Sequence, residues 1–286
     1  MEPVHTTVQD DRAPTMRARS LSLARRLLSG AGRMSLVAYD IAPMVEAAAL
    51  SHGVTARGEL VVACRADDEV PATTWTGGPL RVRVDVTKEA PEWAVRITAC
   101  AVHLLGELEW LPVETLDDYL FGAGLDPAVT EIAGAVGGRL GVIRTDRVLV
   151  HDSAGVLALA LGEVIGSHPA GGLPMGPRSF PDADQEWAAR DLVGRLSPDQ
   201  LAGLVQAATG GWDRGVTLSS RAETTCSHAE GQVFCVDVDR TGLTLMAVDV
   251  GRTGIHFFAF DTPADTLDAL ADRLGRLVAV GLRSAH

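Results

Sequence analysis

The segment 80–86, LRVRVDV, constrains the fold most, because its side chains alternate strictly between apolar and polar. The leucine and valines fall on one face of a β-strand, and the arginines and aspartate on the other. Further strands are expected over residues 34–39, 44–50, 59–64 and 93–106. Because no crossover helix separates them, these strands predict an antiparallel barrel or sandwich rather than a doubly wound parallel sheet.

The C-terminal stretch, 236–280, predicts a strand, a turn, a second strand and a capped helix. The turn is expected at residues 251–254. Thr262 is expected to begin the helix by accepting a hydrogen bond from the amide of Asp265. One helical face is apolar and should pack against the hairpin; it carries Leu267, Leu270, Leu274, Leu277 and Val278.

The remaining segments suggest how the chain is divided. A disordered lead-in is expected at 1–15 and a glycine- and proline-rich linker at 169–182. The first domain is expected at 16–168, between the lead-in and the linker. The second is expected at 183–286, after the linker. The first domain should begin with an amphipathic helix at 17–28, whose arginines are expected on a solvated face. Helices are also expected within 111–138 and at 184–196 and 197–208, and strands at 140–144, 148–151 and 156–160.

Charge and hydropathy exclude several classes of protein. The formal net charge of −12 argues against a non-specific nucleic-acid binder, which needs a positive surface. The longest apolar run, 154–166, is interrupted by Glu163 and is too short to span a bilayer, so no membrane association is expected. No apolar signal core is present near the N-terminus, and a cytoplasmic location is therefore expected.

The only lysine and the four cysteines give weak functional signals. Lys88 lies in a charged segment typical of a solvated turn, which disfavours a catalytic role. Cys64 and Cys100 fall in strand-like apolar runs and are expected in the core. Cys226 and Cys235 flank His228, but their spacing matches no zinc template. No Ser-His-Asp order, P-loop or Rossmann fingerprint is present.

Taken together, four stretches of this chain resemble the haem-utilisation branch of the split-barrel superfamily that also contains pyridoxamine 5'-phosphate oxidases. They are the meander from 34 to 64, the strand pair LRVRVDVTKEAPEWAVRITACAVHLLGELEWL, the hairpin IRTDRVLVHDSAGVLAL, and DVDRTGLTLMAVDV with FFAFDTPADTLDALADRLGRL. The resemblance implies an α+β chain: an antiparallel split β-barrel followed by a small α/β C-terminal domain. A homodimer is also implied, since such barrels usually complete a cofactor cleft between two subunits.

Three functions follow from the resemblance. Members of this branch bind haem, and some degrade it, so haem binding with oxidative haem degradation as a further activity is the leading hypothesis. Plant relatives are adaptors that bind glutamyl-tRNA reductase, which makes a cofactor-free adaptor with a protein partner the alternative. Flavin mononucleotide (FMN) is bound by more distant relatives, and an FMN-dependent oxidoreductase is the third hypothesis. Fold alone does not choose among them.

The family pattern also indicates candidate residues. Its Asp-Arg-aromatic-Gly-Leu turn corresponds here to residues 239–243, with Arg240 as a cofactor-binding candidate. Arg81 and Arg83 are candidates for binding a cofactor phosphate, although arginines on a polar strand face are usually only solvated. The chain departs from the family at 195–200, RLSPDQ, where the usual two histidines are missing.

Haem iron usually takes a histidine ligand. His103, late in the long strand, and His256, at the start of an aromatic strand, are the candidate iron ligands, and His228, in a polar loop, is a further cofactor-binding candidate. His151 enters a turn, which favours an exposed or turn-bonding role. An ordinary structural role is the commoner one for each of them.

Overall fold

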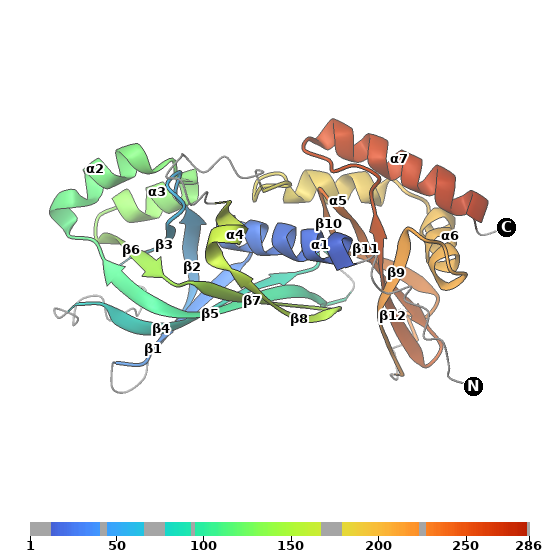
Figure 1. The fold of residues 1–286 in the computed structure, drawn as a ribbon, viewed down its shortest axis with the longest axis horizontal. Helices are drawn as coiled ribbons and strands as arrows, with labels where there is room; N and C mark the ends of the chain where they lie inside the picture. Colours follow the sequence, from blue (N-terminus) through green and yellow to red (C-terminus); the bar gives the residue numbers. More distant parts are fainter. Residues whose placement is uncertain are drawn as a thin grey trace, which may run out of the picture.

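The computed structural model describes residues 13–40, 45–65, 78–92, 95–166, 179–222 and 227–284. The elements follow one another as in Figure 1. The helices are α1 (Ala13–Arg26), the π-helical turn η1 (Leu27–Ala31), α2 (Val113–Ala123), α3 (Pro127–Gly134), α4 (Leu161–Ile165), α5 (Glu186–Gly194), α6 (Pro198–Thr209) and α7 (Leu267–Ser284). The strands are β1 (Arg33–Ala38), β2 (Val45–Val54), β3 (Leu60–Arg65), β4 (Leu80–Glu89), β5 (Thr98–Trp110), β6 (Gly138–Arg144), β7 (Arg147–Asp152), β8 (Gly155–Ala160), β9 (Gly215–Arg221), β10 (Gln232–Asp239), β11 (Gly242–Asp249) and β12 (Arg252–Ala259).

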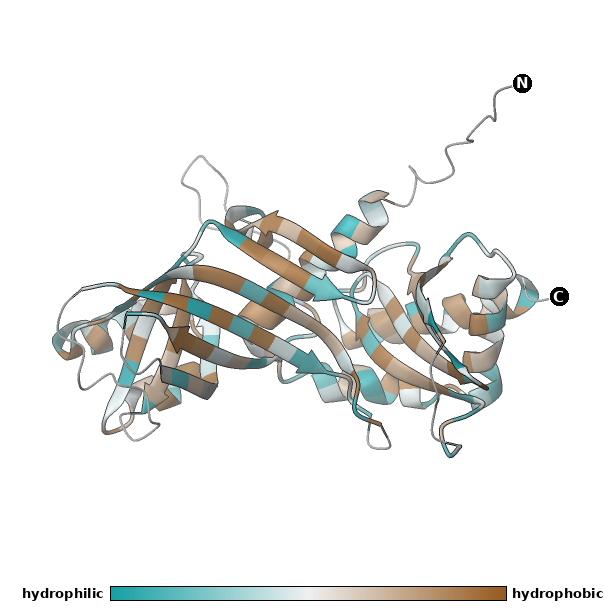
Figure 2. Cartoon of the chain, turned by 90° about the horizontal axis from the view of Figure 1, so that it is seen from below, coloured by the Kyte–Doolittle hydropathy of each residue, from teal (hydrophilic) through white to brown (hydrophobic). Residues whose placement is uncertain are grey.

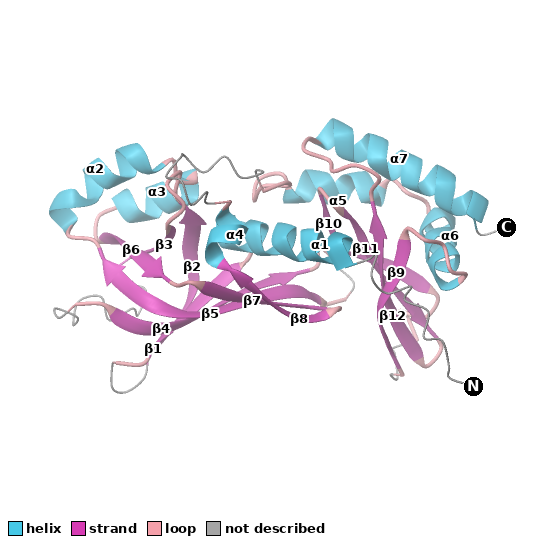
Figure 3. Cartoon of the chain, viewed as in Figure 1, coloured by secondary structure: helices cyan, strands magenta, loops and turns pink. Residues whose placement is uncertain are grey.

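Six antiparallel strands close into a barrel, which confirms the α+β split-barrel expectation. Their order is β4-β1-β2-β3-β6-β5, and β5 pairs with β4 to complete the ring. The hairpin β7–β8 extends the sheet beyond β5. It reaches towards the second sheet, as Figure 3 shows.

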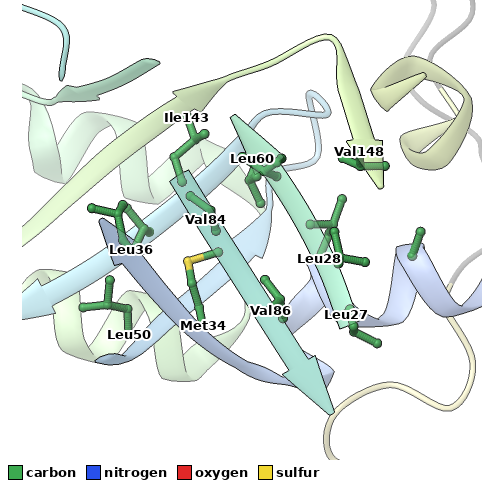
Figure 4. Packing of buried hydrophobic residues seen from close by; sticks show 14 of the residues in the cluster. Leu27, Leu28, Met34, Leu36, Leu50, Leu60, Val84, Val86, Ile143 and Val148 are labelled. Atoms are coloured by element: carbon green, nitrogen blue, oxygen red, sulfur yellow. The ribbon is translucent and has the colours of Figure 1, made fainter. Parts of the chain in front are cut away.

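The barrel core is built from the apolar face of each strand. In β4 the residues alternate between buried and more exposed, as the sequence predicted, with Val84 and Val86 fully buried. The same banding of hydrophobic and hydrophilic residues is visible along the long strands in Figure 2. Leu27 and Leu28 of η1 enter this core beside Met34 (Figure 4). Burial of such apolar surface is the main favourable term in folding.

The second sheet has the order β10-β11-β12-β9, and α5, α6 and α7 pack on one of its faces (Figure 1). The predicted apolar face of the C-terminal helix is confirmed: Leu270, Leu274 and Leu277 are buried against Leu245 and Phe258 of the hairpin. The helix expected at 197–208 is α6, and it begins with a capping box, in which Ser197 and Gln200 exchange side-chain-to-backbone hydrogen bonds.

Two predicted boundaries in the C-terminal stretch were wrong. The first hairpin strand ends at Asp249 and the second begins at Arg252. The turn is therefore residues 250–251 rather than 251–254, and Gly251 adopts a φ of +70°. The helix begins at Leu267, and Thr266 rather than Thr262 caps it by accepting from the amide of Ala269 at 3.1 Å. A tertiary contact explains the later start of the helix: Ala264 is buried, and its amide donates to the carbonyl of Arg240.

Two arginines of the first helix, Arg19 and Arg26, are not on a solvated face, which corrects another prediction. Arg19 and Arg26 are buried, with 3% and 0% of their surface exposed. The helix begins at Ala13 and lies between the barrel and the second sheet (Figure 1), so Arg19 and Arg26 are covered, whereas Arg17 is exposed as expected. Lys88 is likewise buried within β4, and its expected place in a solvated turn was wrong.

Some predictions lie outside the described residues. These are residues 1–12 of the lead-in, residues 169–178 of the linker, Cys226, and the first residues of the strand expected from residue 93. The structure places the start of that strand at Thr98. In the part of the chain that the structure describes, no helix is long and apolar enough to cross a membrane.

Candidate functional site

Pairing of three barrel strands places a row of side chains on the outer face of the barrel. Asp85 of β4 lies opposite His103 of β5, which lies opposite Leu149 of β7. The neighbours of Asp85 along β4, Val84 and Val86, point into the core, so Asp85 points outward. The row therefore joins a carboxylate, an imidazole and an apolar side chain at the surface.

His103 is held by Asp85. Its Nδ1 lies 2.6 Å from Asp85 Oδ1, where an N–H donates to the carboxylate. The carboxylate favours the tautomer with hydrogen on Nδ1 and leaves the Nε2 lone pair available. His151 lies beside it, with ring centroids 4.7 Å apart in an edge-to-face arrangement. A histidine oriented in this way resembles one prepared to bind a metal centre.

Two hollows meet at this histidine pair. The first, the barrel-face hollow, has a volume of about 780 Å³ and is lined, besides the two histidines, by Arg83, Asp85, Leu104, Leu105, Arg147 and Leu149. The second, the inter-sheet cleft, has a volume of about 410 Å³ and lies between β5 and β7 of the barrel and β9, β11 and β12 of the second sheet. Both volumes fall in the range of small-molecule sites.

The two arginine candidates on β4 are already bound to carboxylates. Arg83 Nε donates to Asp85 Oδ2 at 2.9 Å, so Asp85 holds both Arg83 and His103. Arg81 donates to Asp40 at 2.6 Å and is largely exposed. The Arg81 guanidinium holds the pKa of the Asp40 carboxyl below its usual value by hydrogen bonding. The barrel-face hollow includes Arg83 but not Arg81.

The other candidates lie in the second sheet, away from His103. His256 is buried, and its Nδ1 lies 3.2 Å from Thr217 Oγ1. It pairs with Leu245 and faces the helices, whereas the adjacent Ile255 lines the inter-sheet cleft. Burial lowers the pKa of the His256 imidazole.

Arg240 and His228 are placed in turns. Arg240 binds Asp265 at 2.6 Å and thereby holds the segment before α7. In the same turn, Asp239 accepts hydrogen bonds from Thr241 and Gly242, so the Asp-Arg-Thr-Gly-Leu sequence has a structural explanation. His228 is exposed, and its carbonyl accepts from Gln232.

A buried group of charges, the junction cluster, joins the barrel to the second sheet. Arg26 binds both oxygens of Asp237, at 2.7 and 3.0 Å, and Glu186 at 2.6 Å. Lys88 Nζ binds the same two carboxylates at 2.6 and 2.7 Å. Each cation therefore contacts both anions, which explains how Arg26, Lys88 and Asp237 are buried together beside the half-buried Glu186. Sequence analysis missed this cluster because its members are up to 211 positions apart.

The cysteines are not placed for thiol chemistry or for a metal site made of several protein ligands. Burial raises the pKa of the Cys100 thiol to about 12 and also raises that of Cys235. Both are therefore inert at neutral pH. Cys64 is buried too, as expected. Across the ranges that the structure describes, no three histidine, cysteine or acidic side chains are placed to hold a metal ion together.

Comparisons with known proteins address the fold. No protein-family model and no curated protein sequence matches the chain. Among solved structures, a haem-binding protein from Mycobacterium smegmatis aligns over 92% of this chain and 98% of its own, with 14% identity and a TM-score of 0.50. A protein of unknown function from Agrobacterium tumefaciens aligns over 96% of this chain and 100% of its own, at 16% identity and a TM-score of 0.36. An FAD- and haem-binding protein from M. smegmatis covers 52% of this chain and 68% of its own, at 14% identity and a TM-score of 0.29. The first of these alignments supports a shared fold over nearly the whole of both chains.

Proposed function

We propose that this protein binds haem at the barrel-face hollow, where His103 Nε2 would hold the iron. The observation that carries the proposal is the 2.6 Å contact between His103 Nδ1 and Asp85. It orients the ring and leaves the other nitrogen free to bind a metal, as carboxylates do for metal-binding histidines. His256 faces the helices of the second sheet and stays an untested alternative ligand.

The lining of the hollow fits a flat, largely apolar ligand that carries anionic groups. Leu105 and Leu149 supply apolar surface, and Leu105 is 66% exposed. Arg147 supplies positive charge at the rim, whereas the charge of Arg83 is paired with Asp85. A haem bound there would supply an iron centre, and this hollow would supply one imidazole and an apolar surface.

The fold similarity supports the same proposal. The M. smegmatis protein that aligns over 92% of this chain is described as haem-binding. We further propose that a second copy covers the barrel-face hollow, since this hollow is open and carries the exposed Leu105. Sedimentation of the protein with and without haemin tests this assembly, and a monomer in both states would contradict it.

Titration of the purified protein with haemin tests the binding proposal. We expect a saturable shift of the Soret band for the wild type and at least tenfold weaker binding for His103→Ala. His228→Ala is the matched control, because His228 is exposed in a turn outside both hollows. Unchanged binding by His103→Ala would remove His103 as the ligand. Absence of a Soret shift in the wild type would overturn haem binding and favour the adaptor hypothesis.

The same samples distinguish the other hypotheses. Addition of a reductant in air to the haem complex tests degradation, which would appear as steady loss of the Soret band. Titration with FMN tests the flavin hypothesis. We expect weak or no FMN binding, because Arg81 and Arg83 are already paired with Asp40 and Asp85.

A further inference from the structure

The inter-sheet cleft differs in chemistry from the barrel-face hollow. Hydroxyl groups line both of its walls, from Thr98 and Ser153 of the barrel and from Ser219 and Thr253 of the second sheet. The register of the second sheet places Ser219 beside Ile255, and Arg221 beside Thr253. The cleft thus offers donors for an anion next to the apolar side chains of Ile255 and Met246.

Among the charged side chains that line the cleft, Arg221 is the cation available to bind a ligand. Asp152, on the barrel wall, is buried and bound by the guanidinium of Arg19. Arg19 also lies over the ring of Phe257, at 5.2 Å, and is therefore fixed. Arg221, on the opposite wall, is exposed and forms no ion pair with a carboxylate among the described residues. The field of the cleft is consequently set by Arg221.

The histidine pair connects the cleft to the proposed haem site. His103 and His151 line both hollows, so one ligand can contact both without a change in backbone. A ligand held by His103 in the barrel-face hollow would therefore be next to the polar lining of the cleft. Arginine binds carboxylates through two parallel hydrogen bonds, and serine and threonine hydroxyls can complete such a site.

We propose that the inter-sheet cleft binds the carboxylate groups of a tetrapyrrole, with Arg221 as the specificity-determining residue. This inference rests on the proposed haem site and deepens it. It assigns ligand choice to the second sheet: the barrel supplies the imidazole, and the second sheet selects molecules with a carboxylate edge. The two sheets are then both required for tight binding.

Arg221→Ala tests the assignment, with Arg252→Ala as the matched control. Arg252 lies on β12 next to Thr253, at the same end of the same sheet. Successive strand residues point to opposite faces, so Arg252 is directed away from the cleft. Both variants lose one exposed positive charge. We expect haemin to bind at least tenfold more weakly to Arg221→Ala and unchanged to Arg252→Ala.

Two altered ligands separate this inference from the haem proposal. Haemin with esterified carboxylates should bind equally to the wild type and to Arg221→Ala, because the interaction with Arg221 is absent in both. Metal-free protoporphyrin, followed by fluorescence, should lose affinity in Arg221→Ala but not in His103→Ala, because it has no iron. Urea unfolding of each variant shows that the fold is retained.

The outcomes are distinct. If haemin binds and His103→Ala weakens it, but Arg221→Ala behaves like Arg252→Ala, the haem site stands and the cleft assignment is overturned. If protoporphyrin depends on Arg221 while haemin does not depend on His103, the cleft stands and the proposed iron ligand is overturned. If the wild type binds neither ligand, both are overturned.

Discussion

The barrel and the second sheet meet in two places, and the chemistry of the two contacts is opposite. At the junction cluster, Arg26 and Lys88 are buried and each binds Glu186 and Asp237. At the inter-sheet cleft, the walls stay apart and Arg221 is exposed. Buried charges are tolerated only when paired, whereas an exposed cation in a hollow can still bind a ligand. The closed contact therefore fixes the relative position of the two sheets, and the open contact is available for binding.

The largest expected effect is at the closed contact. Arg26→Met removes the guanidinium that binds both oxygens of Asp237 and leaves the buried Asp237 and the half-buried Glu186 to share Lys88. We expect a loss of about 3–5 kcal/mol in the free energy of unfolding, measured with urea. Arg81→Met is the control, because the ion pair of Arg81 is exposed, and it should change the midpoint little. A loss no larger than that of the control would show that the cluster does not join the sheets.

Acid should weaken the same contact. Burial by itself raises the pKa of Asp237, but Arg26 and Lys88 outweigh burial and hold that pKa well below its usual value. A lowered pKa in the folded state gives stability that is complete above the unfolded value, near ~3.9, and is lost as the pH falls below it.

Urea unfolding between pH 7 and pH 3 measures this dependence. We expect the free energy of unfolding to begin to fall as the pH approaches ~4. The fall should be shallower in Arg26→Met, because Asp237 then has one cation fewer. Equal slopes in both proteins would assign the acid sensitivity to other carboxylates.

A smaller effect is expected beside the open contact. Asp85→Asn retains a hydrogen-bond acceptor for His103 but removes the negative charge, so haemin affinity should fall about tenfold, equivalent to ~1.4 kcal/mol. Asp40→Asn is the control, since Asp40 binds Arg81 and does not contact His103. The Soret band of the Asp85→Asn complex should also shift, because the ligand field of the histidine changes. An unchanged spectrum and affinity would show that Asp85 does not position His103.

The smallest effect is expected far from both contacts. Ser197 caps α6 within a capping box, and Ser197→Ala should cost about 1 kcal/mol of unfolding free energy. Haemin affinity should stay at the wild-type value, because α6 lines neither hollow. A change in affinity would show that a loss of stability by itself weakens haemin binding. The affinities of Arg221→Ala and Arg252→Ala would then have to be compared at equal stability.

Local patterns in the sequence were sufficient for most elements. The alternation of β4 predicted its two faces, and the spacing of Leu270, Leu274 and Leu277 predicted the buried face of α7. Helix caps were predictable where the cap is local, as at Ser197 and Asp126. These features depend on residues within a few positions of one another, so the sequence alone contains their cause.

The site was only partly predictable. His103 and Arg83 were identified as candidates, but their connection through Asp85 needed the register of β4 against β5. The pairing of His103 with His151 needed β7 as well. Alternation shows which residues face outward, but not which outward residues of different strands are neighbours.

The sequence by itself determined most of the strands and helices and the acidic charge, and its resemblance to a known family indicated the barrel. Tertiary structure alone decided the burial of Arg26 and Lys88, the start of α7, and the meeting of His103 with the cleft that holds Arg221. The physical reason is sequence distance: Arg26 and Asp237 are 211 positions apart. Whether a charge is solvated or buried depends on what is packed against it, and that is set only when the barrel and the second sheet come together.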